Sequence, residues 1–260
     1  LTNNKNEIFM NEVYISICIP CYEMSGKGHK YLEHNLNHIV SQNYKNFEVI
    51  ISDQSQDDKI KTLCKKYKEI ISVKYFLNKD GKKQASANTN YAMQKASGDI
   101  IKIMFQDDYF FSNNALSIIH DAFSKNKISW CVSSCQHSND GVSVFRKFYP
   151  DYNDNIQFGK NTISSPSVLA IKRENYISFD EELIYLMDVD LYKRYFDRDG
   201  LPYVIDDILV VNRLHSKQVS QMTSKSLIRS ELQYIRSKFR NQMKLKSWFI
   251  YLKRVFKTYF

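Results

Sequence analysis

The chain has 260 residues, 43% of them hydrophobic and 14% aromatic, with only 7 Gly and 4 Pro, a globular composition that excludes a disordered or collagen-like chain. Its formal charge of +9 arises at one end, because ten of the 37 Lys and Arg residues but only one of the 28 Asp and Glu residues lie in 223–260, which leaves 27 of each in the first 222 residues. A nucleic-acid-binding domain spreads its bases over the fold, so this neutral body argues against nucleic acid as a partner.

The first 110 residues alternate apolar, β-branched runs with amphipathic helical patterns. The predicted strands cover 13–20, 47–53, 72–76 and 99–105, and the predicted helices between them cover 29–42, 57–67 and 86–97. Strands that alternate with helices predict an α/β fold in which helices flank a mostly parallel central sheet. Ligands of such sheets bind beyond the carboxyl ends of the strands.

Polar residues follow three of these strands, where a ligand site is expected. They are Tyr22 and Glu23 after the first strand, Asp53 at the end of the second, and Asp107 and Asp108 after the fourth. Two adjacent carboxylates repel each other and are unfavourable to bury, and a hard divalent cation such as Mg²⁺ or Mn²⁺ relieves that conflict. Such an ion usually shares its shell with substrate phosphates, so a nucleotide diphosphate is the natural ligand. The alternative is an acidic turn that caps a helix predicted over 112–122.

The second half of the chain is less regular. Strands are predicted over 128–134, 142–148, 167–171 and 204–214, and a helix over 183–196. The composition changes near Met222, so we predict one domain over 1–222 and a basic helical tail over 223–260.

Seven short motifs follow one another in a specific order. They are PCYE at 20–23, SDQSQDD at 52–58, SANTNYAMQKASGD at 86–99, FQDD at 105–108, YLMDVDL at 185–191, RLH at 213–215 and QVS at 218–220. Together they resemble the family 2 glycosyltransferases, which have the nucleotide-diphospho-sugar transferase fold called GT-A. The resemblance spans roughly residues 15–220 and implies a nucleotide half over 13–110 and an acceptor half over 111–222.

The resemblance also implies a site for the sugar donor. Pro20, Tyr22 and Glu23 would line the pocket for the nucleobase and ribose, and Asp53 would accept a hydrogen bond from the base, as the family reads uracil. Glu23 stands where the family commonly has Asn. Lys83 lies in a Lys- and Gly-bearing loop at 78–84 and is our candidate for contact with phosphate, the alternative being a solvated run of charge.

For the metal and the diphosphate, the resemblance implies three residues. Asp107 would lie near the ribose and the metal, Asp108 would bind the metal that bridges the diphosphate, and His215 would approach the same metal or the diphosphate. The expected cofactor is Mn²⁺ or Mg²⁺.

Asp188 falls at the family's catalytic-base position. An inverting sugar transfer needs one carboxylate to deprotonate the acceptor hydroxyl while that hydroxyl attacks the anomeric carbon. Asp188 and Asp190 lie near the start of the helix predicted over 183–196, on which Leu186, Met187 and Leu191 form part of the apolar face. The alternative is that Asp188 or Asp190 caps this helix or pairs with Arg194.

Cysteine usage and hydropathy bear on the compartment. The five cysteines are an odd number in a long chain, which argues against a disulfide framework, and we expect Cys18 and Cys21 to be core thiols. The opening LTNNKNEIFMNE has no apolar run typical of a signal peptide, and no window approaches the ~18 apolar residues of a spanning helix. We therefore expect a cytoplasmic protein.

The basic tail contains two amphipathic patterns. Ile228, Leu232, Ile235 and Phe239 repeat at helical spacing, and so do Leu245, Trp248, Leu252, Val255 and Tyr259. Bases beside exposed aromatic and aliphatic residues are typical of a helix that lies on an anionic membrane. The alternative is that the tail packs on the body or on a second protomer.

These observations together predict an inverting, metal-dependent glycosyltransferase that takes a nucleotide diphospho-sugar, UDP-linked, as donor. The acceptor would be a saccharide, lipid-linked, in the synthesis of a bacterial surface glycan, and the protein would be peripheral at the inner face of the cytoplasmic membrane. Two alternatives remain at this stage: a sugar-phosphate nucleotidyltransferase, and a non-catalytic module that binds membrane or glycan. If the tail packs on a second protomer, the protein would be an oligomer, and this alternative also remains.

Overall fold

The computed structural model describes residues 13–216 and 218–259. The opening twelve residues, on which the expectation about a signal peptide rests, lie outside this range, and so does the side chain of Ser220 from the QVS motif.

The first half of the chain alternates strand and helix as predicted. Its elements are β1 (Ile15–Cys21), the 3₁₀ turn η1 (Met24–Gly26), α1 (Gly28–Val40), β2 (Phe47–Asp53), α2 (Lys59–Lys68), β3 (Val73–Leu77), α3 (Ala85–Gln94) and β4 (Ile100–Ile103). β1 pairs in parallel with β2 and β4, and β2 pairs in parallel with β3. Every residue of β1, β2 and β4 is buried, as expected for the central strands of a parallel sheet covered on both faces.

The second half completes the same sheet. Its elements are β5 (Tyr109–Phe110), α4 (Ala115–Lys125), β6 (Trp130–Ser138), β7 (Val144–Phe148), η2 (Pro166–Val168), β8 (Leu169–Lys172), η3 (Arg173–Asn175), α5 (Met187–Asp199) and β9 (Tyr203–Arg213). Within the described residues, nine strands lie in the order β3-β2-β1-β4-β8-β6-β9-β5, with β7 paired to β6. β8 is antiparallel to β4 and β6, whereas β6 and β9 are parallel over a long register.

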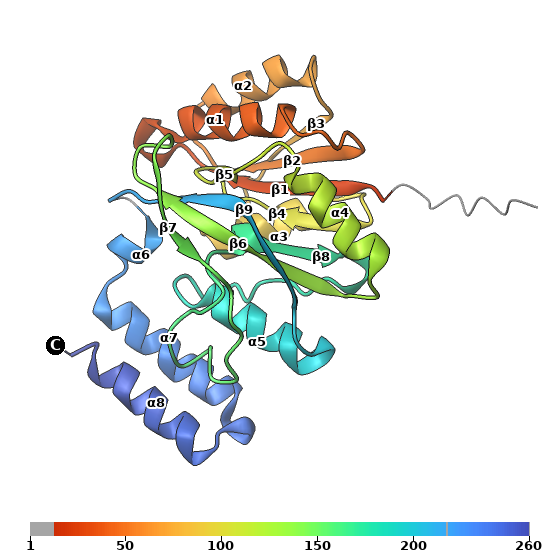
Figure 1. Cartoon of the computed structure of the whole chain (residues 1–260). Coiled ribbons are helices and arrows are strands. Elements are labelled where there is room, and N and C mark those ends of the chain that lie inside the picture. Colours follow the sequence, from red (N-terminus) through yellow and green to blue (C-terminus); the bar gives the residue numbers. More distant parts are fainter. Residues whose placement is uncertain (1–12, 217, 260) are drawn as a thin grey trace, which may run out of the picture.

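The layers of the fold are visible in Figure 1. α1 and α2 cover one face of the sheet, and α3 and α5 lie on the other. The predicted α/β fold with a largely parallel sheet and flanking helices is confirmed. Several boundaries differ by a few residues. α5 begins at Met187 rather than near residue 183, α4 covers Ala115–Lys125 rather than 112–122, and β6 ends at Ser138 rather than 134.

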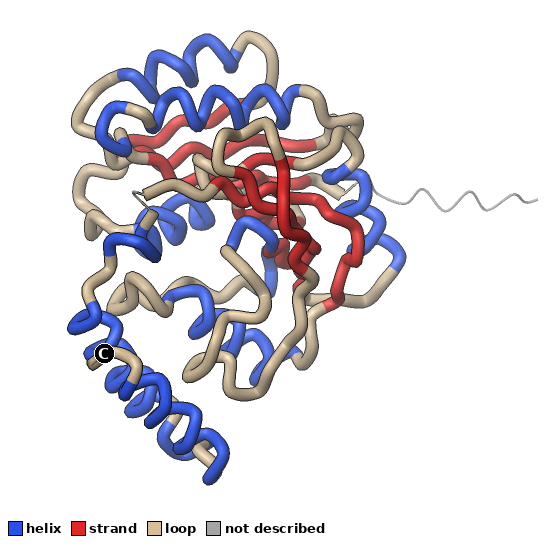
Figure 2. Tube along the Cα trace, turned by 60° about the vertical axis from the view of Figure 1, so that its left-hand side comes forward, coloured by secondary structure: helices blue, strands red, loops and turns tan. Residues whose placement is uncertain are grey.

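The tail forms α6 (Val219–Met222), α7 (Lys225–Lys238), the turn η4 (Arg240–Gln242) and α8 (Leu245–Phe256). α7 and α8 run side by side at the edge of the molecule farthest from α2 (Figures 1 and 2). The apolar stripe of α7 packs into the core, where Leu232 and Ile235 are fully buried. The two tail helices therefore differ in packing, because α7 buries its apolar stripe whereas Leu245, Phe249, Leu252 and Phe256 of α8 are 58–90% exposed.

No helix in the described part of the chain is long and apolar enough to cross a membrane.

Candidate active site

The carboxyl ends of β1 and β2 lie side by side, with Cys21 opposite Asp53 in the sheet register. The chain leaving β1 is held by Gln106, whose side chain accepts from the N–H of Tyr22 at 2.7 Å and donates to its carbonyl at 3.0 Å. Gly28 permits this packing, since a Cβ there would lie 2.1 Å from the carbonyl oxygen of Tyr22. The residues after β4 thus fix the loop that bears Tyr22 and Glu23.

Asp107 and His215 meet at this edge although 108 residues separate them. His215 Nε2 lies 3.0 Å from Asp107 Oδ2, and its ring stacks on Tyr31 with centroids 5.4 Å apart. Burial, and then the charge of the nearby Asp107, raise the pKa of Tyr22. The structure therefore brings together three predicted site residues, Tyr22, Asp107 and His215.

Asp108 lies behind this group and is buried. Its Oδ1 accepts from the N–H of Arg213 at 3.0 Å, and its Oδ2 accepts from Ser165 Oγ at 3.4 Å. Burial, and then the charge of Asp107, raise the pKa of Asp108 well above its ordinary value. The helix-capping alternative is excluded, because α4 begins at Ala115 with Asn114 at its N-cap.

The two aspartates and His215 suit a hard divalent cation. A buried carboxylate whose protonation is favoured by a neighbouring carboxylate gains from a cation that neutralises both. Mg²⁺ and Mn²⁺ sites of this kind take one or two carboxylates and complete their shell with water and substrate phosphates. The residues that the structure describes contain no group of three or more His, Cys, Asp or Glu side chains placed to hold a metal by themselves, so substrate phosphates and water would have to complete the shell of any ion at this edge.

The other predicted donor residues are less open. Asp53 is fully buried, with Oδ1 accepting from the N–H of Ser55 and Oδ2 from the hydroxyl of Tyr75, both at 2.9 Å, and burial raises its pKa. Pro20 is buried within β1, whereas Lys83 is exposed on the loop after β3. Both carboxylate oxygens of Asp53 therefore already accept hydrogen bonds from the protein, whereas Lys83 is open to solvent.

Asp188 lies in the first turn of α5 and is partly exposed. Its Oδ2 accepts from Asn161 Nδ2 at 2.6 Å and its Oδ1 from the N–H of Val189 at 2.7 Å, so a helix-start role accompanies any catalytic one. Burial is the main cause that raises the pKa of Asp188, to about 6. For Asp190 the structural alternative holds, since it is fully buried and pairs with Arg194 at 2.8 Å.

One short loop, residues 161–165, contacts both Asp188 and Asp108. Asn161 binds Asp188 and also donates to the carbonyl of Ser164, and Ser165 reaches Asp108. Ser164 has a φ of 95°, a left-handed conformation that is unfavourable for a residue other than glycine. Backbone strain of this kind, held in place by surrounding hydrogen bonds, is common at functional sites.

Lys102 of β4 holds the segment that follows this loop, at η2 and the start of β8. It is fully buried, and its ammonium donates to the carbonyls of Ser167, Ile103 and Leu169. Burial lowers the pKa of Lys102 to about 7. Sequence reasoning missed Lys102 and Asn161, because a lysine in an apolar strand and an asparagine in a polar loop carry no spacing signal.

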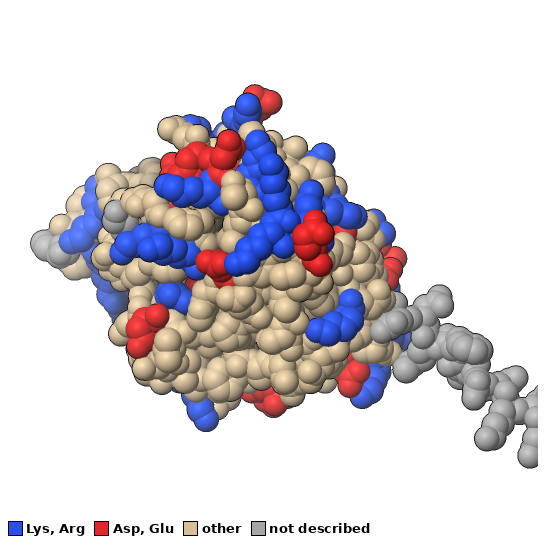
Figure 3. Space-filling model, turned by 90° about the horizontal axis from the view of Figure 1, so that it is seen from above, with Lys and Arg blue, Asp and Glu red and all other residues tan. Residues whose placement is uncertain are grey.

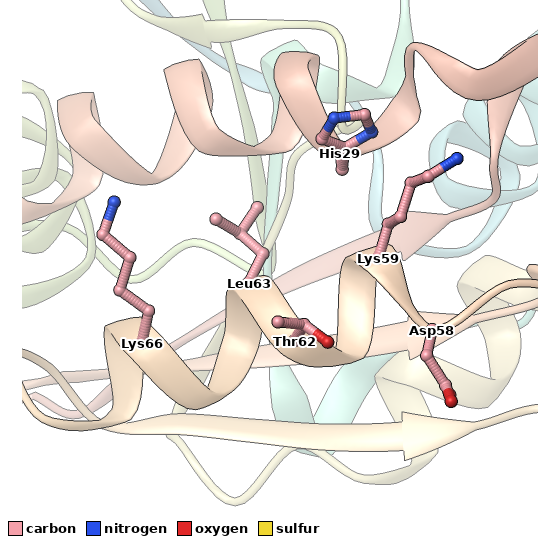
Figure 4. Close-up of a pocket in the computed structure, with 6 residues that line it drawn as sticks. All are labelled: His29, Asp58, Lys59, Thr62, Leu63 and Lys66. Carbon is pink, nitrogen blue, oxygen red and sulfur yellow. The ribbon is translucent and has the colours of Figure 1, made fainter.

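Two other surfaces lie away from this site. A pocket of about 500 Å³ between α1 and α2 is lined by His29, Asp58, Lys59, Thr62, Leu63 and Lys66 (Figure 4). None of the predicted site residues lines it. Figure 3 shows the molecule from above, where basic and acidic side chains are interspersed on one face.

The cysteines agree with the sequence-based expectation. All five are buried free thiols. Burial raises the pKa of Cys18 and Cys21 far above the ordinary range of a thiol, which makes both unreactive.

Comparison with known proteins places this geometry in context. Residues 16–178 match the family model described as Glycosyl transferase family 2. An uncharacterized glycosyltransferase of Rickettsia typhi is 25% identical over 220 residues, covering 79% of this chain and 65% of that protein. The GalNAc(5)-diNAcBac-PP-undecaprenol beta-1,3-glucosyltransferase of Campylobacter jejuni is 27% identical over 109 residues, covering 42% of this chain and 34% of that protein. The chain therefore spans less than two thirds of the length of these relatives.

Solved structures show the same fold. A structure of residues 1–349 of S. aureus TarS in complex with UDP-GlcNAc superposes with a TM-score of 0.72 at 18% identity, covering 94% of this chain and 73% of that one. A mannosyltransferase from Pyrobaculum calidifontis in complex with GDP-Man and Mn²⁺ gives 0.64 at 13% identity, covering 94% and 69%. At these identities the likeness establishes the GT-A fold and nothing finer.

Proposed function

This chain belongs to glycosyl transferase family 2, and from that premise we propose that it is an inverting, metal-dependent enzyme that transfers a sugar from a UDP-sugar to a saccharide acceptor. The observation that carries the proposal is the convergence of Asp107, His215 and Asp108 at the carboxyl edge of the sheet, joined to Asp188 through residues 161–165. Family membership favours transfer over the nucleotidyltransferase and the non-catalytic alternatives.

In the proposed donor site, Tyr22 and Glu23 would contact the nucleoside, Asp53 the base, and Lys83 the phosphates. Gln106 fixes the backbone of Tyr22, so the loop after β1 is already ordered for binding. Asp108 and His215 would hold Mn²⁺ or Mg²⁺ together with the substrate phosphates, and Asp107 would lie near the ribose and the metal. The metal, when bound, would offset the negative charge of the departing diphosphate. The UDP-GlcNAc of the S. aureus neighbour and the Mn²⁺ of the P. calidifontis neighbour support this choice of donor and metal by analogy.

Asp188 would act as the general base. Its Oδ2 is oriented by the amide of Asn161, and its pKa of about 6 leaves it ionised near neutral pH while keeping it a stronger base than an ordinary aspartate. In an inverting reaction this carboxylate takes the proton of the acceptor hydroxyl as that oxygen attacks the anomeric carbon, and the nucleoside diphosphate leaves from the opposite side.

For the acceptor we propose a lipid-linked saccharide used in bacterial surface glycan synthesis, reached at the inner face of the membrane. The name of the C. jejuni relative specifies an undecaprenol-linked acceptor. In this chain α8 supports a membrane contact, because an apolar stripe formed by Leu245, Phe249, Leu252 and Phe256 is 58–90% exposed. The lysines at 246, 253 and 257 line one flank of that stripe, which is the pattern of a helix on an anionic leaflet.

The donor and metal assignments are tested by hydrolysis of UDP-sugars in the absence of acceptor. The wild-type protein should release UDP with Mn²⁺ and lose this activity in EDTA, and Asp107→Asn and Asp108→Asn should each reduce it by about 10²-fold or more. Equal hydrolysis by both variants in Mn²⁺ would show that the carboxylate pair does not serve the donor.

The membrane contact is tested by sedimentation with vesicles of phosphatidylglycerol and phosphatidylcholine. Replacing Phe249 and Phe256 with Glu should abolish binding, since the apolar stripe then carries charge. Val142→Glu is the matched control, because Val142 is 82% exposed but lies outside the tail. Unchanged sedimentation of the α8 variant would refute the membrane contact without affecting the assignment of the donor site.

A further inference from the structure

Glu231 is the single acidic residue among the 38 residues of the basic tail, and it does not face solvent. Its side chain is 3% exposed and points from α7 to the chain that enters α5. There its carboxylate accepts from three consecutive backbone N–H groups: Ile184 at 2.8 Å, Tyr185 at 3.0 and 3.2 Å, and Leu186 at 2.8 Å.

This contact determines how the chain enters α5. The three N–H groups lead into α5, whose N-cap is Leu186, and have no partner within the helix. The start of a helix carries a partial positive charge that favours a carboxylate nearby. A carboxylate that accepts from all three N–H groups is held by charge-assisted hydrogen bonds, which are stronger than neutral ones. It also accounts for the late start of α5, because the N–H groups of residues 184–186 donate to Glu231 instead of to carbonyls one helical turn earlier.

Glu231 is in turn held by the packing of the part of α7 that follows it. The neighbouring Leu232 and the next-turn Ile235 are fully buried in the core. Lys238 bridges Asp180 at 2.6 Å and Asp190 at 2.7 Å, the latter on α5 itself. Figure 1 shows α7 next to α5 along this contact. The carboxylate therefore reaches residues 184–186 from a rigid support.

We propose that Glu231 is a positioning residue for Asp188, holding the segment that delivers this carboxylate to the acceptor. The proposal rests on the proposed function, in which Asp188 is the general base. Leu186, whose N–H Glu231 holds, precedes Asp188 by two residues, and Asn161 orients the same carboxylate from the other side. The basic tail is then part of the catalytic unit, because α7 supplies one of the two supports of the base.

The charge of Glu231 has a second consequence. Two titratable groups face Asp188, namely Glu231 from α7 and the phenol of Tyr192 from α5, while Asn161 is neutral. The negative charge of Glu231 adds to the effect of burial in raising the pKa of Asp188. Removing that charge should lower this pKa, so the acidic limb of the pH–rate profile should move to lower pH.

The test compares three variants of the full chain by kcat, donor KM and pH profile. Glu231→Gln keeps the size of the side chain but places an NH₂ group against the backbone donors, and it should lower kcat about tenfold or more with little change in donor KM. Its acidic limb should shift to lower pH. Glu231→Asp keeps the charge but shortens the reach, so kcat should fall while the limb moves less.

Leu232→Ala is the matched control, because it weakens the packing of α7 and leaves the carboxylate in place. It should lower Tm without moving the acidic limb. If Glu231→Gln behaved like this control, with lower Tm and an unmoved limb, or if it kept wild-type kcat, Glu231 would not position the base. If Asp188→Asn retained full transfer, the base assignment itself would fail, and that result is distinguishable because it does not depend on any change at Glu231.

Discussion

Replacing Asp188 with Asn should inactivate the enzyme and stabilise its fold. The pKa of Asp188 is raised from an ordinary 3.8 to about 6, mainly by burial. Since the folded state binds this proton more tightly than the unfolded chain, the ionised carboxylate destabilises the protein above pH 6, and this penalty disappears below pH 3.8. A shift of two units corresponds to about 3 kcal/mol, which partial exposure of the residue reduces to about 2 kcal/mol.

Asp188→Asn removes the ionised form while keeping an oxygen for Asn161. At pH 7.5 we expect a free energy of unfolding about 2 kcal/mol higher, seen as a Tm rise of roughly 4 to 8 °C. Transfer should fall by about 10²-fold or more at the same pH. Calorimetry from pH 4 to 8, with sugar transfer measured on the same samples, checks both effects. A Tm gain that is absent at pH 7.5, or that is equally large at pH 4, would refute the linkage between burial and basicity.

Further predictions concern the supports of the site. Gly28→Ala places a methyl group against the carbonyl of Tyr22, so the loop after β1 should shift and the KM for the UDP-sugar should rise several-fold, as steady-state kinetics would show. Lys102→Met leaves backbone carbonyls unpaired in the core and should lower the free energy of unfolding by about 1 to 3 kcal/mol in a urea titration. His215→Ala removes the partner of Asp107 and should raise the Mn²⁺ concentration needed for half-maximal hydrolysis by about tenfold, measured by metal titration.

Much of the fold follows from local sequence patterns. β1 and β2 are largely apolar, β-branched runs, and the helices between the first strands carry one apolar stripe each. These patterns predict the parallel half of the sheet and the edge at which polar residues gather. The antiparallel pairing of β8 with β4 cannot be predicted from these patterns. Strand order depends on packing between distant parts of the chain, and the spacing of apolar residues carries no information about it.

The tail illustrates the limit of periodicity. The predicted stripe of Leu245, Trp248 and Leu252 is 38–90% exposed in α8, whereas Tyr251, which lies next to that stripe, packs inward and is 4% exposed. α8 carries apolar residues around much of its circumference, so spacing alone cannot decide which of them pack against the rest of the protein. In α7 a single stripe exists, and there the pattern identifies the buried face correctly.

The site was predicted in part. The order of motifs led to Tyr22, Asp107, His215 and Asp188, and the first three meet at one edge of the sheet. Contacts such as that of Glu231 with residues 184–186 cannot be read from sequence, because a single glutamate in a basic helix has no spacing relative to a segment some 45 residues earlier. The catalytic roles of all these residues remain predictions.

The central claim is that the carboxylate edge binds a nucleotide diphospho-sugar through a divalent cation. Isothermal titration of UDP into the wild-type protein, with Mn²⁺ and then with EDTA, tests it most directly, with Asp107→Asn in parallel. We predict binding in Mn²⁺ that is lost in EDTA and weakened at least about tenfold in the variant. UDP binding of equal affinity in all three samples, or no binding in any of them, would contradict the claim.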